Sequence, residues 1–181
     1  MPVPARHNIV LVGFMGSGKS SIGRMVATLL GFQFVDTDRI IVERAGMEIP
    51  DLFAREGESA FRDLETSALN SLGHLARCVI ATGGGAILRE QNRALLRDLG
   101  FVVGLTVSEE KILERVSRNA RRPLLQTANP RETITRMLAE RRPFYEEAAQ
   151  FTLDTSDLSH AQAAEVILGE ARRVFMWQGA A

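Results

Sequence analysis

The chain has 181 residues, and its 22 basic and 22 acidic side chains give a formal net charge of zero. A protein without a basic excess lacks the positive field that attracts nucleic acids and acidic membranes, so we expect neither as a partner. With 45% hydrophobic residues and charges along its whole length, the chain is neither disordered nor of low complexity, and its size is typical of one domain. We therefore interpret residues 1–181 as a single domain.

Short apolar segments alternate with amphipathic ones along the chain. The segments that are typical of buried strands are 8–13, 32–35, 78–81, 101–107 and 151–153. Apolar residues at helical spacing predict helices at 19–30, 39–45, 59–75, 90–99, 109–118, 131–147 and 161–175. Strands separated by helices pair in parallel through right-handed crossovers. The sequence thus predicts an α/β fold, a three-layer α/β/α sandwich around a parallel sheet of about five strands.

The cysteine content and the first residues bear on the compartment. Cys78 is the single cysteine, so it cannot form an internal disulfide, which fits a reducing environment. No long apolar segment stands near the N-terminus, so neither a signal peptide nor a membrane span is predicted there. We expect a cytoplasmic protein.

A complete phosphate-loop motif, Gly13-x-x-x-x-Gly18-Lys19-Ser20, follows the first predicted strand and opens the first predicted helix. Its glycines let consecutive backbone N–H groups surround a β-phosphate, and the positive end of the helix faces the same anion. In this motif the lysine reaches the β- and γ-phosphate oxygens, and the serine hydroxyl ligates Mg²⁺. The sequence lacks the Asn-Lys-x-Asp motif that reads guanine, so an adenine nucleotide is the expected donor.

Polar residues also follow the next two strands. If the chain is still extended there, the carboxylates of Asp36 and Asp38 share one side, so that Asp36 holds Mg²⁺ through water and Asp38 meets an acceptor hydroxyl. The alternative is that Asp38 only caps a helix beginning at Arg39. The glycines of Thr82-Gly-Gly-Gly85 are either a flexible turn or a place where backbone amides approach a small polar ligand. Because ligands bind at the carboxyl ends of parallel strands, these endings predict one site.

Three arginines are ambiguous from spacing alone. Arg62 lies beside the apolar stripe of its predicted helix. Its position there is explained at least as well by ion pairs with Glu58 or Glu65 as by a functional role. Arg141 and Arg142 precede a proline, where cations at a helix end would complement the helix dipole.

The polar segment 119–130 contains two prolines and no apolar periodicity, which predicts a mobile surface loop. A loop of this length in a compact domain is often a lid over a site. The three histidines, His7, His74 and His160, show no ligand spacing, and we assign them no role.

Taken together, these motifs resemble the shikimate kinase family. The segments that carry the resemblance are, in chain order, 13–23, 36–38, 61–65, 82–85, 121–125 and 141–146. It extends from about Asn8 to Leu168 and is more specific than the phosphate loop, because other phosphate-loop proteins do not share the whole set. The resemblance implies transfer of the γ-phosphoryl group of ATP to the 3-hydroxyl of shikimate, giving shikimate 3-phosphate and ADP on the route to chorismate and the aromatic amino acids.

For the fold, the resemblance implies a phosphate-loop kinase with a substrate-binding segment at about 37–65 and a lid at about 116–130. Members of the family are usually monomers, so a monomer that binds ATP and shikimate is expected. Two alternatives stay open: a kinase for another small acceptor, such as gluconate or a nucleoside monophosphate, and a nucleotide-binding sensor without turnover.

The resemblance also implies roles for the residues around ATP. The nucleotide-binding positions are Gly16, Ser17, Gly18, Lys19, Ser20, Ser21, Arg115, Arg122 and Leu158. Among them, Arg122 matches the lid arginine that closes on the phosphates and Arg115 the one that lies against adenine. Segment 155–160 lacks a proline that some members have, which leaves the backbone near Leu158 as the expected adenine contact. Ser20 and Asp36 are the expected Mg²⁺ positions.

On the acceptor side, the matching positions are Asp38, Arg62, Gly83, Gly84, Gly85 and Arg141. The resemblance implies that Asp38 binds the ring hydroxyls, that Arg62 and Arg141 hold the carboxylate, and that Gly84 supplies a backbone contact. A family acidic residue matches Glu65 and would orient Arg62. Lys19, Asp38 and Arg122 are the implied catalytic residues, because phosphoryl transfer needs positioning and neutralised charge more than covalent help.

Overall fold

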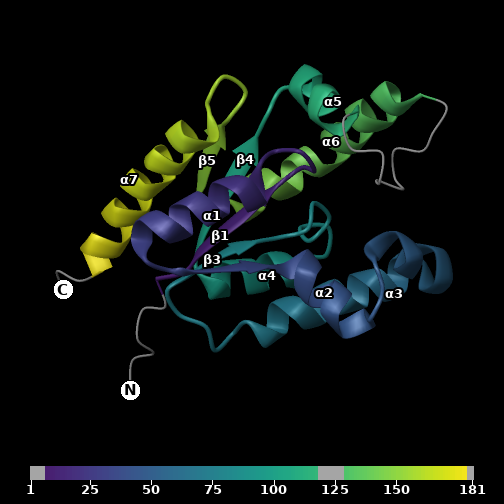
Figure 1. The fold of residues 1–181 in the computed structure, drawn as a ribbon, viewed down its shortest axis with the longest axis horizontal. Coiled ribbons are helices and arrows are strands. Elements are labelled where there is room, and N and C mark those ends of the chain that lie inside the picture. Colours follow the sequence, from purple (N-terminus) through teal and green to yellow (C-terminus); the bar gives the residue numbers. More distant parts are fainter. Residues whose placement is uncertain (1–6, 118–128, 179–181) are drawn as a thin grey trace.

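The structure, a computed structural model, describes residues 7–117 and 129–178. Its centre is a parallel sheet of five strands: β1 (Ile9–Gly13), β2 (Gln33–Asp36), β3 (Cys78–Ala81), β4 (Phe101–Thr106) and β5 (Phe151–Asp154). The order across the sheet is β2-β3-β1-β4-β5 (Figure 1). The helices are α1 (Lys19–Leu30), α2 (Thr37–Ala45), α3 (Ile49–Ser71), α4 (Glu90–Leu99), α5 (Glu109–Ser117), α6 (Pro130–Ala148) and α7 (His160–Gln178). The predicted parallel sheet is confirmed.

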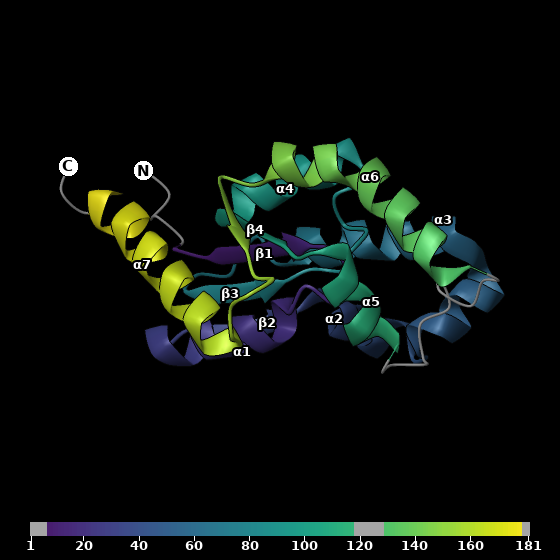
Figure 2. The same cartoon turned by 90° about the horizontal axis from the view of Figure 1, so that it is seen from above.

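Helices cover both faces of the sheet, so the predicted three layers are also confirmed (Figure 2). Alternate residues of β1 point to opposite faces: Ile9 and Leu11 pack in a cluster with α1 and α7, and Val10 and Val12 pack in a cluster with α4 and α6. A strand with two covered faces needs apolar residues at every position. This explains why the strands appear in the sequence as continuous apolar segments rather than alternating ones.

Helix α2 begins two residues earlier than the sequence analysis expects. The side chain of Asp36 caps it, because its Oδ1 accepts a hydrogen bond of 3.1 Å from the backbone N–H of Asp38. The interpretation of Asp38 as a cap before Arg39 is therefore wrong, and so is the extended chain at Asp38, which already lies in the first turn of the helix.

Helix α3 begins at Ile49, ten residues before the predicted start at 59. Its first part ends at Gly57, whose φ of 81° and ψ of 175° interrupt the helical geometry, and the helix then continues to Ser71. Glycine adopts this positive φ without steric cost, so the chain can turn here between two helical parts. Within residues 7–117 and 129–178, none of the helices has both the length and the apolar character needed to cross a membrane.

Candidate active site

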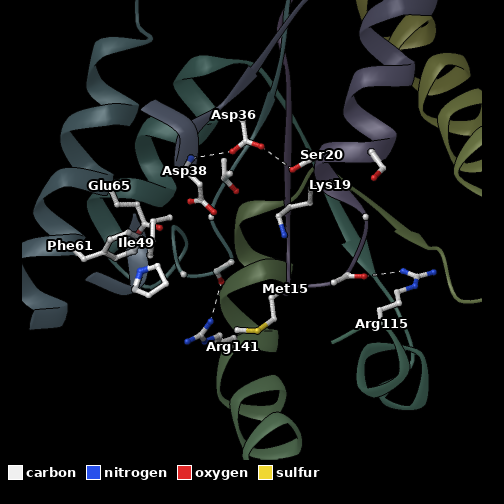
Figure 3. Close-up of a pocket in the computed structure, with 18 of the residues that line it drawn as sticks. Met15, Lys19, Ser20, Asp36, Asp38, Ile49, Phe61, Glu65, Arg115 and Arg141 are labelled. Carbon is white, nitrogen blue, oxygen red and sulfur yellow. Dashed lines mark hydrogen bonds between the residues drawn. The ribbon is translucent and has the colours of Figure 1, made fainter. Parts of the chain in front are cut away.

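A pocket of about 770 Å³ lies where β1, β2 and β3 end, at the edge of the sheet that the sequence indicates (Figure 3). Its lining includes most of the predicted site residues: Gly16, Gly18, Lys19, Ser20, Ser21, Asp36, Asp38, Arg62, Gly83, Gly84, Gly85, Arg115 and Arg141. Ser17 and Leu158 are not part of this lining. Arg122, with most of the predicted lid, lies outside the described residues.

The phosphate loop joins β1 to the first turn of α1. Gly18 is the N-cap of α1 in a left-handed conformation (φ 93°), so the first backbone N–H groups of the helix open toward the pocket without a capping side chain between them. Lys19 is 8% exposed, and its Nζ donates to the carbonyl oxygens of Gly13 (2.7 Å) and Phe14 (3.0 Å). The ammonium group is thus placed over the loop that would surround a phosphate.

A hydroxyl and a carboxylate lie side by side next to this loop. Ser20 Oγ donates to Asp36 Oδ2 at 2.9 Å, and the other oxygen of Asp36 caps α2 (Figure 3). Mg²⁺ binds oxygen ligands and is usually held by one or two protein groups together with phosphate oxygens and water. The pair of Ser20 and Asp36 fits such an ion.

Arg62 is 7% exposed and bonds to two carboxylates. Its Nη1 lies 3.0 Å from Glu65 Oε2, and its Nη2 lies 2.9 Å from Glu58 Oε1. The ion pairs considered as an alternative are therefore present, but the guanidinium also lines the pocket, where a Cβ on Gly85 would overlap it. The ion pairs therefore do not take Arg62 away from the pocket, because the same pairs hold the guanidinium at the pocket wall.

Two carboxylates meet above the bare Cα of Gly83. A Cβ placed on Gly83 would lie 2.7 Å from Asp38 Oδ1 and 2.8 Å from Glu65 Oε1. Glu65 is fully buried, and this burial raises the pKa of its carboxyl above the ordinary value. The positive charge of Arg62 opposes the rise in pKa, and the negative charge of Asp38 adds to it. The glycine is needed here because any side chain would displace both acids.

Arg141 reaches the pocket from α6. It is 8% exposed, and its Nη1 donates to the carbonyl oxygen of Gly84 at 3.3 Å. Helix α6 continues through Pro143 to Ala148, so the interpretation of Arg141 and Arg142 as charges at a helix end is wrong. Arg141 and Arg142 differ in exposure, because the Arg142 side chain is 80% exposed.

The other end of the pocket lies beyond Lys19. Figure 3 shows Arg115 and Asp38 on opposite sides of Lys19, with Arg115 Nη1 donating to the carbonyl oxygen of Gly16 at 2.9 Å. His160 also lines the pocket, and its Nε2 would lie 3.4 Å from a Cβ on Gly18. His160 has no role predicted from the sequence, although it stands in the segment expected near adenine. Leu158 packs instead against the apolar cluster of α1 and α7.

The first part of α3 adds an apolar wall that the sequence analysis missed. Ile49, Pro50 and Phe53 line the pocket, and the rings of Phe53 and Phe61 pack with centroids 4.6 Å apart. The signal in the sequence is the spacing of Ile49 and Phe53 by one helical turn, which stops at Gly57. The pocket therefore has cationic groups at both ends, acids between them, and an apolar wall, which suits two small anionic ligands.

Comparisons with known proteins agree on one family. The family described as shikimate kinase matches residues 15–172. A protein named shikimate kinase from Thermodesulfovibrio yellowstonii is 46% identical over 167 residues, covering 92% of this chain and 96% of that protein. The solved structure of a shikimate kinase from Acinetobacter baumannii in complex with shikimate has a TM-score of 0.87 and 41% identity over 93% of both chains. A gluconokinase from Sinorhizobium meliloti, 19% identical with a TM-score of 0.57 over 96% of this chain and 97% of its own, shares the fold alone.

Proposed function

The chain belongs to the shikimate kinase family. On this basis we propose which of its residues bind the two substrates and which catalyse phosphoryl transfer. The protein is a kinase that transfers the γ-phosphoryl group of ATP to the 3-hydroxyl of shikimate. The observation that carries the assignment of residues is that Asp38, Arg62 and Arg141, from three different helices, line one pocket with the phosphate loop.

ATP would lie along the side of the pocket that runs from Arg115 to Lys19. The open N–H groups at the start of α1 and the ammonium group of Lys19 would bind the β- and γ-phosphates. Arg115 and His160, which lie against Gly16 and Gly18, would flank the base end of the nucleotide. Ser20 and Asp36 would hold Mg²⁺, which supplies positive charge to the phosphate oxygens when it is bound.

Shikimate would occupy the side of the pocket that contains Asp38. Its carboxylate would bind Arg62 and Arg141, since guanidinium groups match carboxylates in charge and geometry. The apolar wall of α3 and the bare glycines 83–85 leave room for the ring beside Asp38. The carboxylate of Asp38 would accept a hydrogen bond from the 3-hydroxyl and aim its oxygen at the γ-phosphorus.

In the transfer itself, the 3-hydroxyl oxygen forms a bond to the γ-phosphorus while the bond to the β-phosphate oxygen of ADP breaks. We assign the hydroxyl proton to Asp38 and the neutralisation of the leaving phosphate to Lys19. Arg122, which lies outside the described residues, is proposed as a second cation on the phosphates. The catalytic residues of this proposal are thus Lys19, Asp38 and Arg122.

The test is ADP release measured with Mg²⁺ and ATP in the presence of shikimate, of gluconate, and of no acceptor. We expect release to depend on shikimate and the product to carry phosphate on the 3-hydroxyl, as read by NMR. Preferential use of gluconate would support a different acceptor. Binding of ATP without turnover of any acceptor would support the nucleotide sensor.

The role of Asp38 is tested by D38N. Asparagine retains a hydrogen bond to the hydroxyl but takes up no proton, so we expect kcat to fall about 10²- to 10⁴-fold while shikimate still binds. Steady-state kinetics and calorimetric titration with shikimate measure the two effects separately. A kcat within tenfold of the wild-type value would exclude Asp38 as the proton acceptor.

We also infer that the protein acts as a monomer in the cytoplasm. Both statements remain predictions. Size-exclusion chromatography with light scattering tests the first, and fractionation of cells tests the second.

A further inference from the structure

The carbonyl oxygen of Gly84 accepts hydrogen bonds from two side chains of α6. The hydroxyl of Tyr145 donates to it at 2.5 Å, and Nη1 of Arg141 donates at 3.3 Å. A carbonyl oxygen has two lone pairs and can accept both bonds. The tyrosine bond is short, whereas 3.3 Å is just beyond the usual range for N–H···O bonds. Tyr145 is therefore the main partner of this carbonyl, and the bond from Arg141 to it is the weaker of the two.

The two donors meet at one point because they are four residues apart on the helix, which places them on the same face one turn apart. Tyr145 is 9% exposed and packs in the core cluster on that face of the sheet. Burial raises the pKa of its hydroxyl far above the ordinary value, so the group stays a hydrogen-bond donor at any working pH. Its ring is fixed by packing and its hydroxyl by Gly84.

Gly84 lines the pocket beside the phosphate loop. A Cβ on it would lie 3.2 Å from the backbone nitrogen of Met15 in the phosphate loop. Its neighbours Gly83 and Gly85 lie against Asp38 and Arg62. A shift of the Gly84 carbonyl would therefore move the surface on which the proposed acceptor groups rest.

We propose that Tyr145 is a positioning residue for the acceptor: its hydroxyl holds the Gly84 carbonyl, so that Arg141 can leave this carbonyl and turn to the substrate carboxylate. The bonds to the Gly84 carbonyl are partly buried, and loss of the partner of such a carbonyl is costly, so a carbonyl that depended on Arg141 alone would retain the arginine. With Tyr145 in place, the carbonyl stays satisfied when Arg141 moves. This inference rests on the proposed role of Arg141 in binding shikimate.

The first experiment is the steady-state kinetics of Y145F, which keeps the packed ring and removes only the hydroxyl. We expect the KM for shikimate to rise about 3- to 10-fold, the effect of one net hydrogen bond, with kcat and the KM for ATP within about twofold of wild type. T135V is the matched control, because it removes a hydroxyl of the same helix that bonds to Glu109 and Arg131 instead. An unchanged KM for shikimate, or equal changes for both substrates, would overturn the proposal.

A double-mutant cycle with R141A separates this inference from the proposed function. If Tyr145 acts through Arg141, Y145F should have no further effect on the KM for shikimate once Arg141 is absent. If R141A itself leaves this KM unchanged, the proposed role of Arg141 fails. If R141A raises it but the two effects simply add, the role of Arg141 stands and the link to Tyr145 fails.

The chain contains one tyrosine and one tryptophan, so the difference between the spectra of wild type and Y145F isolates the tyrosine band that reports on this contact. We expect shikimate to shift the tyrosine band near 280 nm, because the charge of Arg141 moves away from the ring's hydroxyl. The shift should be absent in Y145F. A spectrum of the wild-type protein that is unaltered by saturating shikimate would show that Arg141 does not leave Tyr145, and would contradict the proposal.

Discussion

The two halves of the pocket are built in different ways. The phosphate-binding part of the donor half is a short continuous segment, 13–20, and Lys19 bonds to carbonyl oxygens of the same segment. The acceptor half combines Asp38, Arg62 and Arg141 from three helices, and its cation Arg62 bonds to carboxylates. A binding site for phosphate is thus encoded locally, whereas a binding site for the acceptor depends on how the helices pack.

K19A should give the largest effect on the donor half. Without the ammonium group the leaving phosphate loses a fixed positive charge, so we expect kcat to fall about 10²- to 10³-fold. Shikimate binding, measured by calorimetry without nucleotide, should stay within about twofold of wild type. K111A is the control, because Lys111 is the other lysine of the chain and is exposed. A loss of shikimate binding in K19A as large as the fall in kcat would show that the donor and acceptor halves do not bind their ligands independently.

G83A should act on the acceptor half alone. The new methyl group would lie 2.7 Å from Asp38 Oδ1 and 2.8 Å from Glu65 Oε1, so both acids must shift. Overpacking of this kind costs about 1–3 kcal/mol, which corresponds to a rise of about 5- to 150-fold in the KM for shikimate. The KM for ATP should not change.

The control for G83A is G169A, because a Cβ on Gly169 meets no atom within 4 Å. It should leave both KM values unaltered. If G83A raised the KM for ATP as much as that for shikimate, the assignment of Gly83 to the acceptor half would be wrong.

Glu65 makes the stability of the acceptor half depend on pH. Its pKa is raised in the folded protein, mainly by burial, so below the ordinary value of 4.5 the carboxyl is protonated in both states and its contribution to stability is complete. As pH rises from 4.5 through the folded pKa, that contribution is lost. We expect the free energy of unfolding of wild type, relative to E65Q, to decrease over this interval, as measured by urea titrations. A constant or increasing difference would contradict the assigned direction of the pKa shift.

R142A should have the smallest effect. The Arg142 side chain is 80% exposed and lies 4.0 Å from Glu146, and exposed pairs contribute about 0.2–1 kcal/mol. We expect both KM values within twofold of wild type and little change in melting temperature. Since R141A removes the neighbouring arginine, the pair of variants compares an arginine inside the pocket with one outside it. Equal kinetic effects of R141A and R142A would remove Arg141 from the acceptor half.

The sequence predicts the sheet well because the inner strands β1 and β3 are covered on both faces and are apolar throughout. It also predicts the phosphate loop, whose residues are adjacent in the chain. It fails at the start of α3, because the apolar spacing of Ile49 and Phe53 does not continue past Gly57. Nor does it indicate that Tyr145 bonds to a backbone oxygen of Gly84, because the partner lies 61 residues away and any residue carries such an oxygen.

Asp36 joins the first turns of α1 and α2, with one carboxylate oxygen on the Ser20 hydroxyl and the other on the backbone of Asp38. Displacement of either turn would strain the two hydrogen bonds of the Asp36 carboxylate. If binding of one ligand moves its turn, thermodynamic reciprocity requires each ligand to alter the dissociation constant of the other by the same factor.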